Sequence, residues 1–348
     1  MFLVFAMALT IWLIGRRMQA PAQARWLMIG ILYVVVLAIQ IALPEGAPLR
    51  EVTGGSPALW LILGGAVALV LAYGEVLRRV KARVQDPPAS TAASTQSGPF
   101  SDVELDRYAR HIVMREIGGL GQKRMKDSKV LVVGAGGLGS PALLYLAGAG
   151  IGTIGVVDDD TVSLSNLQRQ VIHTDARSGM PKVFSAEIAM KALNPHIEVR
   201  PYNRRLTDAI AEDLFADYDL ILDGNDNYGT RALVNRAAVA TGKPLISGAI
   251  SQWEGQISLF DPVRGAPCYA CIFPTAPADG LAPSCAEAGV AGPLPGVIGT
   301  MMALEAMKDI TKAGDGLAGR MLLYDALSAE TRTVKLKRRA DCAVCGHL

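Results

Sequence analysis

The stretch KVLVVGAGGLGS, residues 129–140, decides the fold of this chain. Its first half is a short β-branched apolar run, which is typical of a buried parallel strand. Its second half places Gly134, Gly136 and Gly139 at the spacing G-x-G-x-x-G, directly before a helix of small residues. Such glycines permit a tight turn and close approach of the backbone to a phosphate, and the helix N-terminus attracts the anion. The stretch therefore predicts a nucleotide site, without choosing between NAD and ATP.

Strand and helix patterns alternate through the rest of this region. Apolar strand patterns lie at 154–160, 197–202, 218–223, 243–250 and 255–260, and helical patterns at 182–193 and 230–242. This alternation predicts an α/β fold with a Rossmann-like, doubly wound, mostly parallel sheet.

Polar residues follow several of these strands. Asp158 ends the second strand, where an acid can bind a ribose hydroxyl, and Asn166, Arg169, Lys182 and Asp226 come after strands farther along. Because the carboxyl ends of parallel strands share one edge, we expect these side chains to gather there. Cations for phosphates and carboxylates for Mg²⁺ suit a nucleoside triphosphate better than the hydride chemistry of an NAD-dependent dehydrogenase.

The N-terminal region has a different composition. The stretches 26–43 and 57–74 carry no charge and approach the ~20 residues that cross a bilayer core. Residues 1–15 are also uncharged but short, and the positive charges follow this run, which disfavours a signal peptide. We therefore expect a transmembrane anchor, with two spans plus an interfacial segment as the alternative to three spans.

These patterns divide the chain into three parts. The predicted parts are an anchor at 1–83 with spans at about 1–15, 26–43 and 57–77, a flexible Pro/Ser/Thr/Ala-rich linker at 84–99, and a nucleotide-binding domain at 100–348. Basic residues flank the first loop (Arg16, Arg17, Arg25) and follow the third span (Arg78, Arg79, Lys81, Arg83). Basic loops face the cytoplasm. The N-terminus is therefore expected outside the inner membrane and the nucleotide-binding domain in the cytoplasm.

Overall composition excludes several classes of protein. The chain has 348 residues, 51% of them hydrophobic, with a mean hydropathy of +0.29, 34 basic and 32 acidic residues. Disorder throughout is excluded by the apolar content, and a fully embedded transporter by the charges. The net charge of +2 gives no reason to expect nucleic acid as a partner.

Four of the five cysteines form two C-x-x-C pairs. Cys268 and Cys271 form the first pair, and Cys342 and Cys345 the second, near the end of the chain. Two such pairs predict a tetrahedral Zn²⁺ site, with a redox pair as the alternative. Cys285 is left over in a Gly/Pro-rich stretch, 274–296, where a thiolate in a loop can react.

The motifs together resemble the MoeB/ThiF/HesA family, the bacterial relatives of ubiquitin-activating enzymes, most closely its MoeB branch. The resemblance covers residues from about 101 to the end. It rests on RYARHIVMREIGGLGQKRM, VLVVGAGGLGSPALLYLAGAGIG, VDDDTVSLSNLQRQVIH, LNPHIEV, YDLILDGNDNYGTRALVN, PCYACIFP, PSCAEAGV and CAVCG.

The resemblance implies an activity. Family members use ATP to adenylate the C-terminal glycine carboxylate of a small ubiquitin-like sulfur carrier, which then becomes a thiocarboxylate. It implies a MoaD-like carrier for molybdenum cofactor biosynthesis, or a ThiS-like carrier for thiamine biosynthesis, and a sulfur donor such as a cysteine desulfurase. A non-catalytic membrane scaffold is the alternative outside enzymology. A tRNA-modifying relative is disfavoured by the zinc pairs and the lack of a basic stripe.

The resemblance also implies roles for individual residues. Arg110 is expected to reach the partner subunit's ATP site, which implies a homodimer, and Cys285 aligns with a cysteine of a crossover loop that joins in sulfur transfer. The other implied roles are phosphate binding by Gly134, Gly136, Gly139, Asn166, Arg169 and Lys182, ribose binding by Asp158, Mg²⁺ binding by Asp226, and Zn²⁺ binding by Cys268, Cys271, Cys342 and Cys345. The membrane segments are not part of the family pattern, and no rhodanese domain is expected after the second cysteine pair.

Overall fold

A computed structural model describes residues 2–85, 98–278 and 288–348. The chain forms two compact units, residues 1–95 and 96–348. Most of the predicted linker, and Cys285 in the stretch 279–287, lie outside the described residues.

The N-terminal unit is helical. Its helices are α1 (Phe2–Arg17), α2 (Ala22–Ala42), α3 (Pro48–Thr53) and α4 (Pro57–Gln85). A small core of Val4, Val36 and Trp60 joins α1, α2 and α4. Trp60 Nε1 donates to the Thr53 carbonyl oxygen at 3.1 Å, which fixes the α3–α4 connection.

Two segments of this unit, among the described residues, are long and apolar enough to cross a membrane. They are Ala22–Ala42 and Pro48–Leu77, with mean hydropathies of 2.0 and 1.9 and only 11% and 6% of their residues buried. The helix α1 has 16 residues, or about 24 Å at 1.5 Å per residue, whereas the hydrocarbon core measures about 30 Å. The described residues therefore contain two candidate spans by length and composition, where the sequence predicts three.

The second unit contains an eight-stranded sheet in the order β3-β2-β1-β4-β5-β6-β7-β8. The strands are β1 (Lys129–Val133), β2 (Thr153–Val157), β3 (Glu198–Tyr202), β4 (Leu220–Asp223), β5 (Leu245–Ile250), β6 (Glu254–Phe260), β7 (Arg320–Asp325) and β8 (Glu330–Lys335). Strands β1 to β5 are parallel and β6 to β8 are antiparallel additions. The predicted Rossmann-like sheet is confirmed, while β7 and β8 were not predicted.

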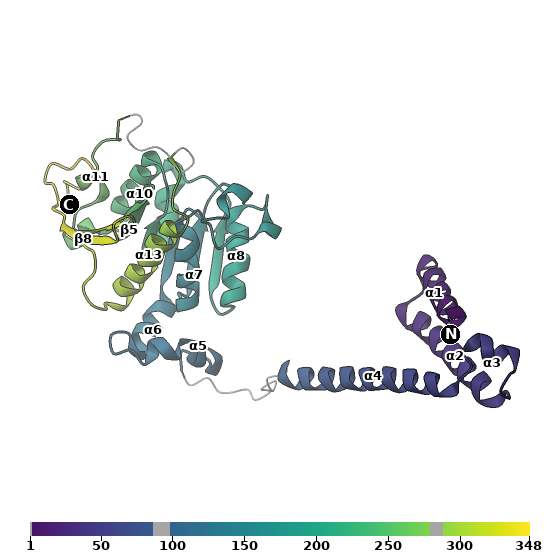
Figure 1. Ribbon diagram of the computed structural model, residues 1–348. Helices are drawn as coiled ribbons and strands as arrows, with labels where there is room; N and C mark the ends of the chain where they lie inside the picture. The colour runs from purple at the N-terminus through teal and green to yellow at the C-terminus, as the bar shows by residue number, and fades with distance from the viewer. Residues whose placement is uncertain (1, 86–97, 279–287) are drawn as a thin grey trace. The chain divides into compact units, whose positions relative to one another are not determined.

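Helices cover both faces of the sheet. The α-helices of this unit are α5 (Asp102–Ile112), α6 (Gly118–Asp127), α7 (Gly139–Ala149), α8 (Lys182–Leu193), α9 (Asp208–Ala216), α10 (Tyr228–Ala240), α11 (Tyr269–Ile272) and α13 (Pro293–Thr311). Helices α7, α8 and α13 lie side by side over one face (Figure 1), and α9, α10 and α11 cover the other. Helix α13 begins inside the Gly/Pro-rich stretch 274–296, for which no helix is predicted from the sequence.

The strand sequences explain this two-sided burial. Along β1, Val130 and Val132 enter the core beneath α7 and α13, while Leu131 and Val133 enter the core beneath α10. Successive side chains of a strand alternate between the faces, so a continuous apolar run suits a strand that is covered on both sides. The strand order reverses between β1 and β4, which places a switch point where the chain leaves both strands.

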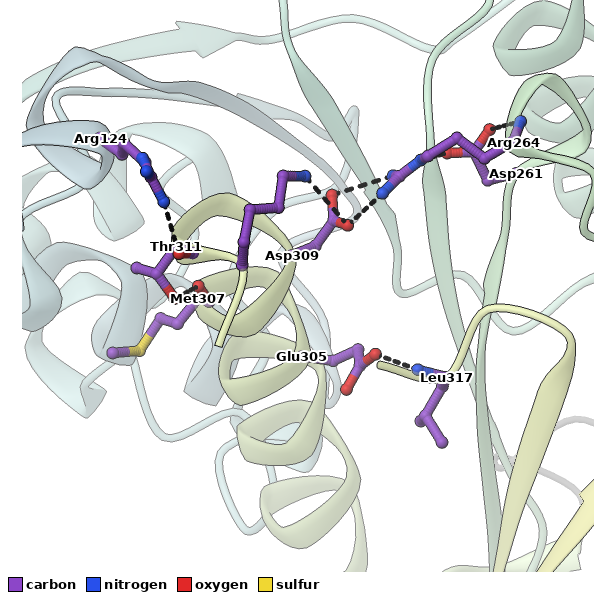
Figure 2. A network of polar contacts seen from close by, with 9 residues as sticks. Arg124, Asp261, Arg264, Glu305, Met307, Asp309, Thr311 and Leu317 are labelled. Atoms are coloured by element: carbon purple, nitrogen blue, oxygen red, sulfur yellow. Dashed lines mark hydrogen bonds and ion pairs between the residues drawn. The ribbon is translucent and has the colours of Figure 1, made fainter. Parts of the chain in front are cut away.

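The amino edge of the sheet is closed by a polar network (Figure 2). Arg264 donates to both carboxylate oxygens of Asp309, at 2.6 and 3.1 Å, and also contacts Asp261. Arg124 donates to the Thr311 carbonyl oxygen at 2.7 Å, and so satisfies the C-terminal end of α13. The network ties α6, α13 and the turn after β6 into one rigid end.

Candidate nucleotide and zinc sites

The glycine-rich turn lies between β1 and α7, at the switch point. Gly134 has φ +96°, a left-handed conformation that favours glycine. A Cβ on Gly139 would lie 1.9 Å from the Gly134 carbonyl oxygen, so a side chain there would break the turn. No side chain caps the N-terminus of α7. Ser140 N donates to the Gly136 carbonyl oxygen at 2.9 Å and Pro141 has no N–H, so the glycine turn and the positive end of the helix dipole are what attract an anion here.

Asp158 follows β2 and holds the turn from the side. Its carboxylate accepts hydrogen bonds from the backbone N–H groups of Ala135 and Asp160, both at 2.8 Å. Burial raises the pKa of Asp158, against the opposing effect of the nearby Lys182 ammonium. The structure therefore places the predicted ribose ligand beside the glycine turn, and gives it a second role in fixing the turn.

Lys182 opens α8 on the same side. Its side chain is 5% exposed, and its Nζ donates to the Asp160 carboxylate at 2.8 Å. Asp160 itself is 68% exposed. Lys182 and Asp158 are close enough for the lysine charge to act on the aspartate. The predicted cation is therefore next to the predicted ribose ligand, as the sequence analysis expects.

Asn166 and Arg169 lie on the segment after β2, which contains the short 3₁₀-helix η1 (Leu164–Asn166). Arg169 Nη2 donates to Asn166 Oδ1 at 2.9 Å. A Cβ on Gly137 would be 3.8 Å from Arg169 Cδ, so the arginine runs alongside the glycine turn. Both predicted phosphate ligands are thus at the turn, half-buried and linked to each other.

The loop after β4 closes the site from the other side. Gly224 N donates to the Val133 carbonyl oxygen at 3.0 Å, and Asn225 Oδ1 would lie 3.4 Å from a Cβ on Gly134. Asp226 follows on this loop and is exposed, just before Asn227, the N-cap residue of α10. The predicted Mg²⁺ ligand is therefore on the loop that contacts the glycine turn.

A buried ion pair, which was not predicted from the sequence, lies beneath this loop and holds it in place. Asp223 ends β4 and lies 3.6 Å from Arg231 of α10, with side chains only 1% and 8% exposed. Ser247 of β5 donates to Asp223 at 3.1 Å, and Arg231 also contacts the Asn225 carbonyl oxygen. The first aspartate of DGNDN, at the end of a buried strand, was the signal for such a network.

His173 holds the glycine turn from beneath. Its Nε2 lies 3.0 Å from the Ala135 carbonyl oxygen, and its Nδ1 lies 2.9 Å from Ser185 Oγ. Because a carbonyl oxygen only accepts, Nε2 carries the proton and Nδ1 accepts from the serine. Burial lowers the pKa of His173 to about 4, so the ring is neutral at pH 7.

Arg110 is not brought to this site. Tyr108, on the same helix α5, packs at the far end of α7, where a Cβ on Gly150 would meet its ring at 2.4 Å. The 11 residues of α7 separate that end from the glycine turn by about 16 Å. Arg110 is exposed two residues beyond Tyr108. A role for Arg110 in nucleotide binding therefore requires a second copy of the chain.

The four predicted zinc ligands gather in one buried cluster. Their closest Sγ–Sγ distances are 3.9 Å for Cys268 and Cys271, 3.6 Å for Cys268 and Cys342, and 3.5 Å for Cys271 and Cys345. Tetrahedral zinc with Zn–S bonds of about 2.3 Å requires Sγ–Sγ separations of about 3.8 Å, whereas a disulfide requires about 2.0 Å. The donor set and its spacing thus fit Zn²⁺.

The surroundings of the cluster also suit thiolates. Asn235 Nδ2 and Arg339 N point at Cys268 Sγ and Cys271 Sγ, at 3.8 and 3.5 Å. Burial raises the pKa of the Cys268 and Cys271 thiols, so these two need a cation to be deprotonated at neutral pH. Asn235 belongs to α10, and the cluster therefore ties the chain end to the helix behind the Asp226 loop.

A cavity of about 410 Å³ lies over the antiparallel end of the sheet. Ala249, Gln256, Leu323 and Arg332 are neighbours in the strand register and line its floor. Because Ala249 lies near the carboxyl end of β5, the cavity opens on the edge of the sheet that carries the glycine turn. The cavity could not be predicted from the sequence, because two of the four strands that form it, β7 and β8, carry no clear strand pattern.

Comparisons with known proteins fit this arrangement. The model of the ThiF family matches residues 108–344, more than half of the chain. The sulfur carrier protein adenylyltransferase of Thermus thermophilus is 49% identical over 247 residues, 70% of this chain and 91% of that protein. The SAMP-activating enzyme E1 of Haloferax volcanii is 47% identical over 244 residues, 70% of this chain and 90% of that protein.

Solved structures share the fold at lower identity. The crystal structure of E. coli MccB with MccA-N7isoASN has a TM-score of 0.61 at 21% identity, and the match covers 71% of this chain and 76% of that chain. The family match begins at residue 108, so the N-terminal helices α1 to α4 lie outside it.

Proposed function

This chain belongs to the ThiF family, and from that membership we propose that it adenylates the C-terminal glycine carboxylate of a small ubiquitin-like sulfur carrier with ATP. One observation carries the proposal: a relative 49% identical over 91% of its own length is a sulfur carrier protein adenylyltransferase. Membership of this family argues against an NAD-dependent dehydrogenase, which the glycine turn alone would also permit.

In the proposed reaction the carrier carboxylate attacks the α-phosphorus of ATP. A bond forms between a carboxylate oxygen and the α-phosphorus, the bond from that phosphorus to the bridging oxygen breaks, and pyrophosphate leaves with the electron pair. Two anions must approach each other, so positioning and positive charge are what the site has to supply. Lys182 and Arg169, beside the glycine turn, provide the charge.

The remaining residues of the edge have supporting roles in this proposal. Asn166 orients Arg169 and contacts the phosphates, and Asp158 binds the ribose. Exposed Asp226 would hold Mg²⁺, and the bound ion would supply positive charge for the departing pyrophosphate. Arg110 acts in the site of a second copy, so we propose a homodimer.

We place the carrier tail in the cavity over β5 to β8. The cavity begins near the carboxyl end of β5 and is open along the sheet, which suits an extended chain end that must reach the α-phosphate. The carrier is proposed to be MoaD-like, for molybdenum cofactor biosynthesis, with a ThiS-like carrier as the second candidate. A cysteine desulfurase supplies the sulfur, and Cys285 joins in its transfer.

Pyrophosphate exchange tests the proposed function. Purified full-length protein is incubated with ATP, labelled pyrophosphate, Mg²⁺ and either a MoaD-like or a ThiS-like carrier. We expect label to enter ATP with the MoaD-like carrier, and faster than with the ThiS-like one. Faster exchange with the ThiS-like carrier would assign the enzyme to thiamine biosynthesis instead. Exchange with neither carrier would favour the non-catalytic scaffold.

Zn²⁺ is proposed to occupy the four-cysteine cluster as a structural ion. Four thiolates fill its coordination shell, so no position is left for a substrate. We expect one zinc per chain by elemental analysis of the protein. Cys342→Ser is expected to lose the metal and lower the melting temperature by several degrees, whereas a variant that keeps both would contradict the assignment.

The N-terminal unit is proposed to anchor the enzyme in the inner membrane. The support is the apolar surface of the two candidate spans, of which only 11% and 6% of the residues are buried. The basic residues Arg16, Arg17 and Arg25 favour a cytoplasmic α1–α2 connection and an enzyme domain in the cytoplasm. Reporter fusions at residues 20 and 50 test this orientation, and a cytoplasmic signal at 50 would contradict it.

A further inference from the structure

Lys182 occupies a position that is unfavourable for a cation. It is the first residue of α8, where the helix dipole presents its positive end, and its side chain is only 5% exposed. A buried ammonium ion without an anionic partner costs several kcal/mol. Its position is therefore set by whichever anion lies against it before a nucleotide arrives.

Asp160 is that anion. Its carboxylate lies 2.8 Å from Lys182 Nζ, and its backbone carbonyl oxygen accepts from Lys182 N at 2.9 Å. Asp160 N in turn donates to Asp158 Oδ1 at 2.8 Å. Asp160 is thus fixed by backbone hydrogen bonds on both sides, and its carboxylate position is set by the chain.

The other groups near the ammonium ion do not replace this contact. Asp158 is close, but each of its carboxylate oxygens already accepts a backbone N–H, from Ala135 and Asp160. His173 and Arg177 also lie on this side, and the first is held neutral by burial. Within the described residues, Asp160 is the carboxylate in hydrogen-bond contact with Lys182.

We propose that Asp160 is a positioning residue for adenylyl transfer, which acts by holding the Lys182 ammonium group at the glycine turn. The inference rests on the proposed function. An ammonium group has three N–H donors, so one bond to Asp160 leaves two for phosphate oxygens. The Asp160 carboxylate also repels the triphosphate, so it orients the lysine without strengthening ATP binding.

This role predicts a separation of rate from affinity. In Asp160→Ala we expect pyrophosphate exchange to fall about 10- to 100-fold, because a catalytic group displaced by about 1 Å can cost about 100-fold. ATP affinity, measured by calorimetry, is expected to be equal to that of the parent protein or tighter. Asp159→Ala is the matched control, since Asp159 is exposed, adjacent and equally charged, and we expect exchange within threefold of the parent.

A double variant tests whether Asp160 acts through Lys182. In a Lys182→Ala background, adding Asp160→Ala is expected to leave the residual exchange unchanged, because there is no ammonium group left to orient. A further loss in the double variant, a weakened ATP affinity in Asp160→Ala, or an Asp160→Ala rate equal to that of Asp159→Ala would each overturn the proposal.

A structural measurement separates this inference from the proposed function. Crystal structures of the full chain in detergent, parent and Asp160→Ala, give the position of Lys182 Nζ without any carrier. We expect Nζ to leave its place beside the turn in the variant. An unmoved Nζ contradicts the positioning role, whereas a parent that exchanges no pyrophosphate with any carrier contradicts the function alone.

Discussion

The two edges of the sheet use charged residues in opposite ways. At the amino edge, Arg264 binds both Asp309 and Asp261, and Arg124 caps the end of α13 (Figure 2). At the carboxyl edge, Asp226 is exposed and the N-terminus of α7 has no side-chain cap. Charges that neutralise each other hold the fold, whereas groups left open beside a glycine turn are available to a ligand. Residue type alone does not distinguish the two cases.

The largest effect is expected at the carboxyl edge. Lys182→Ala should lower carrier-dependent pyrophosphate exchange by about 100- to 1000-fold, because it removes a charge that stabilises the transition state. Its melting temperature should stay within a few degrees of the parent's. Lys191→Ala is the control on the same helix, since Lys191 Nζ only caps the Ile197 carbonyl oxygen. Equal exchange rates in Lys182→Ala and Lys191→Ala would contradict the view that the carboxyl edge of the sheet binds the ligand.

An intermediate effect is expected from His173, which holds the Ala135 carbonyl oxygen of the turn. Its pKa of about 4 in the folded chain lies below the usual 6.5, so the unfolded chain binds more protons between these values. The stability that His173 contributes is present above pH 6.5 and is lost as the pH falls toward 4. Between pH 7 and pH 5 this loss is about 2 kcal/mol.

Urea unfolding of the parent and His173→Asn at pH 7 and pH 5 measures this contribution. We expect the variant to lose about 2 kcal/mol less than the parent over this interval. An identical loss in the parent and His173→Asn would show that the histidine is not buried in its neutral form.

The smallest effect is expected at the amino edge. Arg264→Met removes the hydrogen bonds to Asp309, whose pKa they lower although burial alone would raise it. We expect a loss of about 1–2 kcal/mol in the free energy of unfolding. The loss is smaller than for a fully buried pair, because the arginine side chain is 44% exposed and solvent screens its charge. Exchange per folded molecule should be unchanged. Arg236→Met, which breaks an exposed pair with Asp208, should cost less, at about 0.5 kcal/mol or below.

Local patterns predicted much of this molecule. The strand and glycine turn at 129–140, the alternation after it and the two C-x-x-C pairs depend on neighbouring residues, and the structure places all of them as expected. Asp158, Asn166, Arg169, Lys182 and Asp226 follow parallel strands, so their gathering at one edge is also a consequence of topology.

Contacts across the sheet could not be predicted in the same way. The Asp223–Arg231–Ser247 network depends on the register of β4 and β5, and the cavity depends on β7 and β8, which carry no clear pattern. The span at about 1–15 stays a prediction, because an apolar run indicates burial in an apolar medium but not the length to cross it, and α1 has 16 residues. The role proposed for Arg110 requires a second copy of the chain, whose contacts the sequence of one copy does not give.

The most direct test of carrier adenylation compares two forms of one carrier, intact and lacking its C-terminal glycine. Purified full-length protein is mixed with ATP, Mg²⁺ and labelled pyrophosphate, and label in ATP is measured. We expect exchange with the intact carrier and none above background with the truncated one, because the glycine carboxylate is the nucleophile. Equal exchange with both forms, or exchange without any carrier, would contradict adenylation of the carrier by the carboxyl edge of this sheet.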